Sequence, residues 1–280
     1  MTPKRYLLSA GFILSTFVSA YFVTSTGAQQ AQPAPAVDLS YQIGAILYQQ
    51  RSAEYRALAY QAFNLARWQL DADLDKKNVK KLPKIERKRP RAIVVDIDET
   101  VLDNSPANAL GAKNNAPFNI KDWYAWGEMR KAKPVPGAVD FLNYAVSKGV
   151  KIFYVSNRDE VQKQATIANL ISAGFKDVAL DNVQLRDKES TKEPRRLGVA
   201  ANYRIVMLMG DNLDDFSGVF ERKSVIERFI ETDKARELWG KRFIVLPNAM
   251  YGTWESAVYN YERLTEAQKA ERRAGALELP

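Results

Sequence analysis

The chain has 280 residues, of which 46% are hydrophobic and 26% charged, and its formal net charge is +8 from 41 Lys and Arg against 33 Asp and Glu. These values are typical of a folded protein with one large or two smaller domains. The chain contains neither histidine nor cysteine. This excludes Ser-His-Asp and thiol catalysis, disulfide bonds and His- or Cys-bound zinc within it, and leaves carboxylates, amines, hydroxyls, amides and a hard metal ion.

The first residues have the pattern of an export signal. Two basic residues precede an apolar run at residues 6–23, and the small residues that follow permit cleavage after Ala28. We therefore expect a signal peptide at residues 1–28 and a periplasmic or secreted protein. An uncleaved inner-membrane anchor is the alternative, because the run has the minimum length for a spanning helix. The Ala-, Pro- and Gln-rich residues 29–38 are expected to form a flexible linker.

Helices are expected next, followed by a basic segment. Residues 39–74 contain no proline and repeat apolar residues at helical spacing, which predicts one or two amphipathic helices. Residues 76–91, KKNVKKLPKIERKRPR, are strongly basic and contain two prolines. We interpret them as a solvated connector, and binding of an acidic partner is the less favoured alternative. No aromatic residue is interleaved with these charges, which argues against a nucleic-acid site.

From Arg91 onward, apolar strand-like runs alternate with helical patterns, which predicts an α/β fold with a mostly parallel sheet flanked by helices. Strands are expected at residues 92–98, 150–158 and 182–188, at 203–212 where the strand runs into an acidic loop, and at 241–255, and helices at residues 136–149, 159–175 and 193–202. About fifty residues separate the first two strands, so a small inserted cap is expected at about residues 104–134. The predicted organisation is N-terminal helices and connector at 39–90, a core at 91–263 and a C-terminal tail at 264–280.

Polar residues lie at the ends of four of the predicted strands or shortly after them. The carboxyl ends of parallel strands lie along one edge of a sheet, so these residues can converge although they are far apart in the chain. Their chemistry fits phosphoryl transfer: carboxylates bind Mg²⁺, Ser and Asn donate to phosphate oxygens, and a lysine neutralises charge. One carboxylate can attack phosphorus and another can transfer the proton. The residues are Asp96, Asp98, Ser156, Asn157, Lys188 or Lys192, Asp211, Asp214 and Asp215.

Two stretches carry a family resemblance. VVDIDETVLDN at residues 94–104 and IVMLMGDNLDDF at residues 205–216 resemble the signature motifs of the bacterial class C (nonspecific) acid phosphatase and 5′-nucleotidase lipoprotein family. That family lies in the haloacid dehalogenase (HAD) superfamily, so the resemblance implies a HAD-like fold, Mg²⁺ as cofactor and small phosphomonoesters as substrates. The lipid-modified cysteine of many members is missing here, which removes that route to a membrane but does not affect catalysis.

The resemblance also implies individual roles. Asp96 matches the nucleophile and Asp98 the general acid/base. The implied metal ligands are Asp96, Asp98 through its main-chain carbonyl, Asp211, and Asp215 directly or through water. The implied phosphate-binding residues are Ser156, Asn157 and Lys192, with Lys188 as the alternative lysine.

Aromatic residues give the last expectation. Trp123 in the cap and Tyr251 after the last strand are expected to contact the leaving group and to sandwich a nucleobase, with packing of the cap onto the core as the alternative. We thus expect an exported Mg²⁺-dependent phosphomonoesterase that forms an aspartyl-phosphate, with nucleoside 5′-monophosphates as candidate substrates. The alternatives are a phosphotransferase of the same fold or an inactive storage or binding relative. No nucleic-acid polymer is expected as partner, membrane contact is expected only through an uncleaved N-terminus, and a homo-oligomer is left open.

Overall fold

The computed structural model describes Met1 and residues 38–280. The expected signal peptide and nearly all of the expected linker therefore lie outside the described residues. Within the described part of the chain, no helix combines the length and the apolar character that crossing a bilayer requires.

The N-terminal helices form as the apolar spacing predicts. A short 3₁₀ turn, η1 (Ser40–Gln42), leads into α1 (Ile43–Arg51) and the long α2 (Ala53–Leu74). Ser52 separates α1 from α2 because its hydroxyl oxygen accepts a hydrogen bond from the Tyr55 amide at 3.0 Å, which caps the first turn of α2. The basic segment, expected to be a connector, contains two short helices instead, α3 (Lys76–Lys81) and α4 (Lys84–Lys88).

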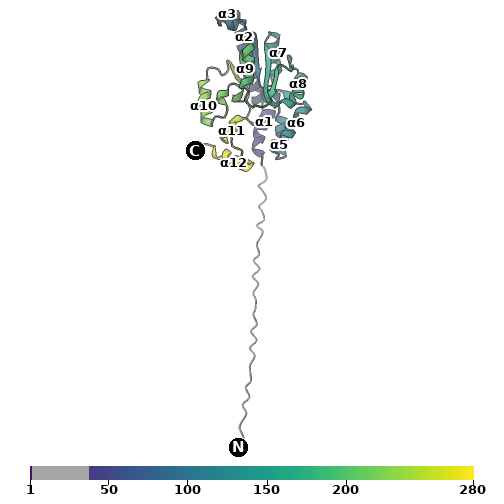
Figure 1. The fold of residues 1–280 in the computed structure, drawn as a ribbon, viewed down its shortest axis with the longest axis vertical. Coiled ribbons are helices and arrows are strands. Elements are labelled where there is room, and N and C mark those ends of the chain that lie inside the picture. Colours follow the sequence, from purple (N-terminus) through teal and green to yellow (C-terminus); the bar gives the residue numbers. More distant parts are fainter. Residues whose placement is uncertain (2–37) are drawn as a thin grey trace. The chain divides into compact units, whose positions relative to one another are not determined.

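A five-stranded sheet organises the rest of the chain (Figure 1), and all four of its strand pairs are parallel. Its order is β5-β4-β1-β6-β7. The strands are β1 (Arg91–Val95), β4 (Lys151–Asp159), β5 (Val183–Arg186), β6 (Arg204–Gly210) and β7 (Phe243–Val245). The parallel α/β fold expected from the alternating pattern is confirmed, although the first strand ends at Val95 rather than at Asp98.

The central strand β1 is buried on both faces. Ile93 and Val95 pack into one apolar cluster with α2 and α7 (Ala138–Ser147), whereas Ala92 and Val94 pack into a second cluster on the other face. This alternation follows from the period of two along a strand, and burial on both faces explains the unbroken apolar run AIVV.

The remaining helices lie between the strands of the sheet or follow its last strand. They are η2 (Glu160–Gln162), α8 (Lys163–Ser172), α9 (Glu193–Asn202), η3 (Leu213–Asp215), η4 (Gly218–Phe220), α10 (Val225–Lys234), α11 (Thr253–Val258) and α12 (Glu266–Gly275). The helix α12 lies where a C-terminal tail was expected. It is packed, since the Arg273 guanidinium lies 3.6 Å from the centre of the Tyr41 ring and donates a 2.7 Å hydrogen bond to the Tyr259 hydroxyl.

The insertion between β1 and β4 begins and ends in a small antiparallel pair, β2 (Leu102–Asp103) with β3 (Lys133–Pro134). Between these two strands lie α5 (Ser105–Lys113) and α6 (Ile120–Met129). The helix α6 carries Trp123 and packs close to η2, where Gly127 leaves room for the Gln162 side chain. The cap is thus fixed over the carboxyl end of the sheet by a two-stranded base.

Candidate active site

A cleft of about 890 Å³ opens at the carboxyl edge of the sheet. Every site residue expected from the sequence lines it, with Lys188 excepted: Asp96, Asp98, Trp123, Ser156, Asn157, Lys192, Asp211, Asp214, Asp215 and Tyr251. The convergence follows from the topology, because β1, β4 and β6 are neighbours and their ends meet at this edge.

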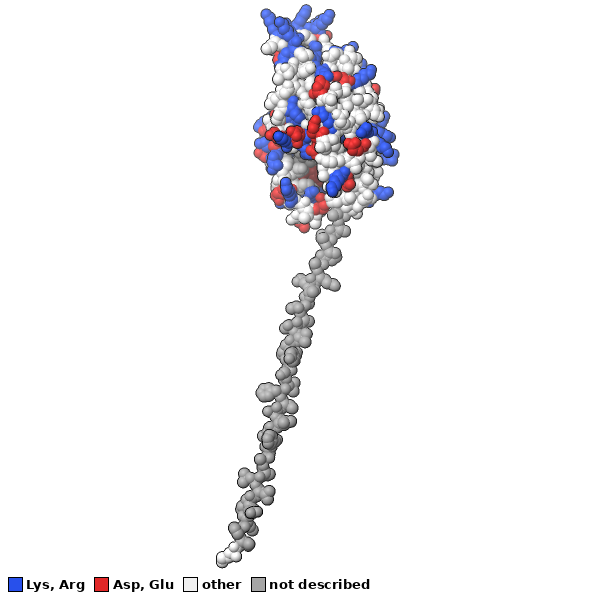
Figure 2. All heavy atoms as spheres, turned by 45° about the vertical axis from the view of Figure 1, so that its right-hand side comes forward, with Lys and Arg blue, Asp and Glu red and all other residues white. Residues whose placement is uncertain are grey.

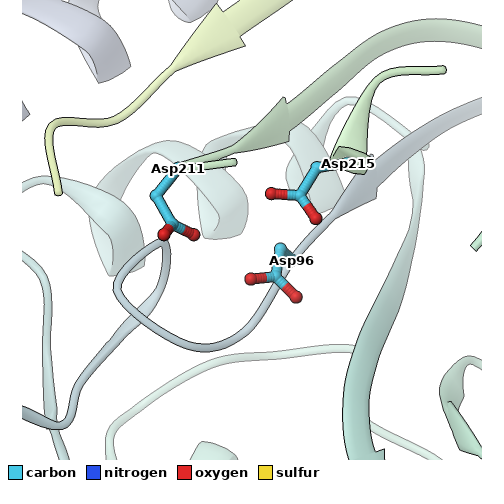
Figure 3. Close-up of side chains that lie close together, drawn as sticks. All are labelled: Asp96, Asp211 and Asp215. Carbon is cyan, nitrogen blue, oxygen red and sulfur yellow. The ribbon is translucent and has the colours of Figure 1, made fainter. Parts of the chain in front are cut away.

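Three carboxylates point toward one another at the bottom of the cleft (Figure 3). Asp96, Asp211 and Asp215 each place a carboxylate oxygen within 4.8 Å of the other two. Asp96 and Asp211 directly follow β1 and β6, and Asp215 lies in η3. Gly210 is required for this approach, because a Cβ at that position would lie 2.3 Å from the Asp215 Oδ2 atom. The three residues form the carboxylate cluster.

Lys192 is buried against this cluster. Its Nζ donates hydrogen bonds to the carboxylates of Asp96 and, at 2.6 Å, Asp215. Burial by itself would lower the pKa of Lys192, but the carboxylates of Asp215 and Asp96 outweigh it and raise that pKa above the usual value, so the amine stays charged. Lys188 is exposed and does not line the cleft, so the structure brings Lys192 to the site.

The charges of the cluster are not balanced by Lys192 alone. Burial raises the pKa of Asp96 well above its usual range, and the nearby Asp215, Asp211 and Asp98 add to this effect while Lys192 opposes it. Burial, followed by the charge of Asp215, raises the pKa of Asp211 to about 7 although Asn248 and Thr100 donate hydrogen bonds to it at 2.9 and 3.0 Å. Three hard oxygen donors with an excess of negative charge fit a divalent cation such as Mg²⁺.

The carboxylate of Asp98 has a different partner from the carboxylates of the cluster, namely Arg158. The Arg158 Nε and Nη2 atoms lie 2.9 and 2.8 Å from Asp98 Oδ1. The side-chain amide of Asn104 donates a hydrogen bond to the same oxygen at 2.8 Å. Arg158 is almost fully buried and also reaches the Thr166 hydroxyl at 3.3 Å. The ion pair and the amide therefore fix the carboxylate of Asp98 at the wall of the cleft.

The Ser156 and Asn157 side chains are already engaged. The Ser156 hydroxyl donates to Asp98 Oδ2 at 3.1 Å and accepts from the Arg158 amide at 3.1 Å. The Asn157 side-chain oxygen accepts from Arg195 Nη2 at 2.7 Å, and Arg195 Nη1 donates to the Ser156 carbonyl at 2.6 Å. Their predicted phosphate-binding role stays a prediction, and Arg195, which the sequence analysis did not select, anchors this part of β4.

Glu99 is a second residue that the sequence analysis missed. It is fully buried, has a backbone φ of 56°, and accepts hydrogen bonds from the Tyr251 hydroxyl and, at 2.7 Å, from the backbone N–H of Asn104. Burial, and next the charge of Asp98, raise the pKa of Glu99 well above its usual range. Because the Tyr251 hydroxyl is bound to Glu99, the Tyr251 ring is fixed at the wall of the cleft.

The cap aromatics Phe118, Trp123 and Trp126 also line the cleft. The guanidinium of Arg158 lies 5.4 Å from the centre of the Trp123 ring. The centres of the Phe118 and Trp123 rings are 6.4 Å apart, at an interplanar angle of 49°. Trp126 donates from Nε1 to the Asn104 side-chain oxygen at 2.8 Å, so it supports the same network. Trp123 and Tyr251 thus both line the cleft, and their action on a nucleobase stays a prediction.

Comparison with known proteins relates this chain to a family. Residues 17–254 match the family model of the HAD superfamily, subfamily IIIB (acid phosphatase). The class C acid phosphatase from Bacillus anthracis is 39% identical, with a TM-score of 0.80 over 86% of this chain and 98% of that one. Its structure with tungstate bound has the same TM-score and coverage at 40% identity.

A more distant similarity is to acid phosphatase 1 of Solanum lycopersicum, 28% identical over 131 residues, which are 45% of this chain. This alignment spans about half (51%) of the tomato protein. The family match covers most of the chain, including the two motifs and the insertion between them, and it confirms the resemblance seen in the sequence. The chain therefore belongs to subfamily IIIB of the HAD superfamily, the acid phosphatases.

Proposed function

We propose that this chain is an exported, Mg²⁺-dependent phosphomonoesterase that forms an aspartyl-phosphate on Asp96. The observation that carries the proposal is the carboxylate cluster with Lys192 at the bottom of a cleft. A relative of the same family binds tungstate, a tetrahedral oxyanion of the shape of phosphate, which supports a phosphate site.

The residues of the chain divide the chemistry between them. An Asp96 carboxylate oxygen attacks phosphorus and the bond to the leaving oxygen breaks, while Asp98 donates a proton to that oxygen. Asp98 then takes a proton from a water molecule as the water oxygen attacks phosphorus. The bond between phosphorus and the Asp96 oxygen breaks, and phosphate is released. Lys192, charged and buried, offsets negative charge throughout. Mg²⁺, held by Asp96, Asp211 and Asp215, would supply further charge neutralisation.

Chelation tests this proposal. Excess EDTA should abolish hydrolysis of an aryl phosphate and Mg²⁺ should restore it, because the cluster then loses the cation that balances its charge. Mg²⁺ should also raise the melting temperature of the protein, and by more at pH 8 than at pH 5. The pKa of Asp211 is about 7, so its carboxyl is neutral at pH 5 and tolerates burial, whereas its charge at pH 8 needs a partner. Full activity in excess chelator would show that the cluster needs no cation.

The same preparation separates the rival activities. A phosphotransferase would transfer phosphate to an added alcohol in preference to water, and an inactive binding protein would bind phosphate without turnover. The presence of a carboxylate at Asp96 beside a charged lysine favours turnover.

The aromatic residues that line the cleft support a proposal for the leaving group. We propose that nucleoside 5′-monophosphates are substrates and that the base stacks on Trp123 or Tyr251, where each stacked base is worth roughly 1–3 kcal/mol. Replacing Trp123 with Ala should then raise KM for a nucleoside monophosphate about tenfold, since about 1.4 kcal/mol is a factor of ten. KM for glycerol phosphate, which has nothing to stack, should barely change.

Tyr251 needs a matched control because its hydroxyl is bound to Glu99. Tyr251→Phe keeps the ring and loses only the hydrogen bond, whereas Tyr251→Ala loses both. If stacking is the function of the ring, KM for the nucleotide should rise with the Ala variant and stay near the parent value with the Phe variant. Equal changes in KM for nucleotide and glycerol phosphate would assign both aromatics to packing.

Export is proposed from the basic and apolar N-terminal pattern of residues 1–28. Full-length protein expressed in a Gram-negative bacterium should appear in the periplasm or medium, with a mass that corresponds to cleavage near Ala28. Retention of the intact mass in the membrane fraction would support the anchor instead.

A further inference from the structure

The positive charge of the chain is concentrated in one segment. Residues 76–91 contain nine of the 41 Lys and Arg and one of the 33 Asp and Glu, so their net charge of +8 equals that of the whole chain. The remaining sequence carries basic and acidic residues in equal number. We call residues 76–91 the basic end.

The structure leaves most of this charge exposed and unpaired. Arg91 binds Asp73 at 2.6 Å and Arg89 lies 3.6 Å from Glu86. Among the residues that the structure describes, no carboxylate forms an ion pair with the other seven basic side chains, all of which are exposed: Lys76, Lys77, Lys80, Lys81, Lys84, Arg87 and Lys88. Lys and Arg gather at this end of the folded part in the space-filling view (Figure 2).

The basic end lies away from the cleft. The helix α4 leads directly into β1 at Arg91, whereas Asp96 follows the opposite end of β1. Five strand residues span about 16 Å at 3.3 Å per residue, and α3 and α12 lie at opposite ends of the folded part (Figure 1). The charge therefore does not serve to hold the phosphate of a substrate in the cleft.

The basic end also exposes an apolar side chain among its charges. Ile85 in α4 is 71% exposed, and Lys84, Arg87 and Lys88 lie in the same short helix. A surface with several cations around one exposed apolar side chain is complementary to a bilayer with anionic headgroups, where the cations stay at the phosphates and the apolar group enters the boundary. A site for single-stranded nucleic acid would need aromatic rings for stacking, and residues 76–91 contain none.

We propose that the basic end docks the folded protein onto an anionic phospholipid surface and leaves the cleft open to solvent. This contact is separate from any insertion of the N-terminal residues and does not rest on the proposed enzymatic function. Because it is electrostatic, it weakens as ionic strength rises and the exposed charges are screened.

Flotation of full-length protein with vesicles tests the proposal. The vesicles are phosphatidylcholine alone, or phosphatidylcholine with one quarter phosphatidylglycerol, at about 50 mM salt. One variant carries Lys76, Lys77, Lys80 and Lys81 changed to Gln. A matched variant carries the same change at four exposed lysines outside the basic end that also form no ion pair in the described structure, Lys113, Lys131, Lys176 and Lys188. Both keep residues 1–37 and lose the same net charge, so they differ only in where charge is removed.

The basic-end variant should lose at least about tenfold in affinity for the anionic vesicles, whereas the matched variant should stay within about twofold of the parent protein. The difference should vanish at 0.5 M salt and be absent on neutral vesicles. Equal losses for the two variants would overturn the proposal, because binding would then depend on net charge alone. Melting temperatures of both variants check that the proteins are folded.

Three further measurements sharpen the result. Ile85→Ser leaves the charge unchanged and should weaken binding to anionic vesicles by about threefold. A poly(U) RNA that binds more tightly than the vesicles at equal salt and displaces them would assign the basic end to nucleic acid and refute the lipid proposal. Where phosphatase activity is present, vesicle-bound protein should hydrolyse a soluble substrate with unchanged kcat/KM, and a large loss would refute the open orientation of the cleft.

Discussion

Replacing Asp96 with Asn should remove phosphatase activity by a factor on the order of 10⁴ or more while the protein stays folded. An amide is a poor nucleophile toward phosphorus and a poor ligand for a hard cation. Stability should be retained, because burial and the neighbouring carboxylates already disfavour the charged form of Asp96 and a neutral amide removes that repulsion. The measurements are kcat/KM on an aryl phosphate and the melting temperature without added metal.

Asp214→Asn is the matched control for this experiment. Asp214 also lines the cleft, but its carboxylate lies 3.3 Å from Arg228 and outside the carboxylate cluster. The control should retain activity within a few-fold of the parent protein. If the Asp96 variant kept comparable activity, the aspartyl-phosphate route would be wrong, and if both variants lost activity equally, general disturbance of the cleft would explain the effect.

The residues that meet at the carboxyl edge of the sheet could be predicted, because the sequence signals for the strands and for the polar residues at their ends are local. Strands such as β1 are buried on both faces and appear as unbroken apolar runs, and the polar residues that end them are adjacent in sequence. Once the strands are parallel, the meeting of Asp96 with Asp211 and Asp215 follows from topology without knowledge of any distance.

The partners of these residues were not predictable, since they come from long-range packing. Arg158 pairs with Asp98 across 60 positions, and Tyr251 reaches Glu99 across 152. Glu99 sits between two residues of the same motif and has no pattern that separates it from an exposed acid. Only the structure shows that it is buried and hydrogen-bonded.

Two helices that the sequence analysis missed did carry local signals. Ser224 with Glu227 begins α10, and Thr265 with Gln268 begins α12, each with the reciprocal side-chain to backbone bonds of a capping box. The basic end was read as a connector because its prolines suggested irregular backbone. Pro83 instead occupies the N-cap position of α4, where the missing amide hydrogen costs nothing.

Replacing Asp98 with Asn should separate leaving groups by their need for a proton. Loss of a general acid costs about 10²–10⁴-fold where the leaving oxygen must be protonated, as in an alkyl ester such as glycerol phosphate. An aryl oxide needs little protonation, so phosphoryl transfer to Asp96 should persist with an aryl phosphate and the aspartyl-phosphate should then hydrolyse slowly. Rapid-quench measurements should show a burst of phenol followed by a slow steady rate.

The position of Asp98 in the structure makes this test selective. Its carboxylate is fixed by Arg158 and Asn104 and lies outside the carboxylate cluster, so an isosteric amide should leave Asp96, Asp211 and Asp215 in place. Chelator sensitivity and the Mg²⁺-induced rise in melting temperature should therefore match the parent protein. Equal losses for aryl and alkyl esters, without a burst, would show that Asp98 acts by holding Arg158 and Ser156 rather than by transferring a proton.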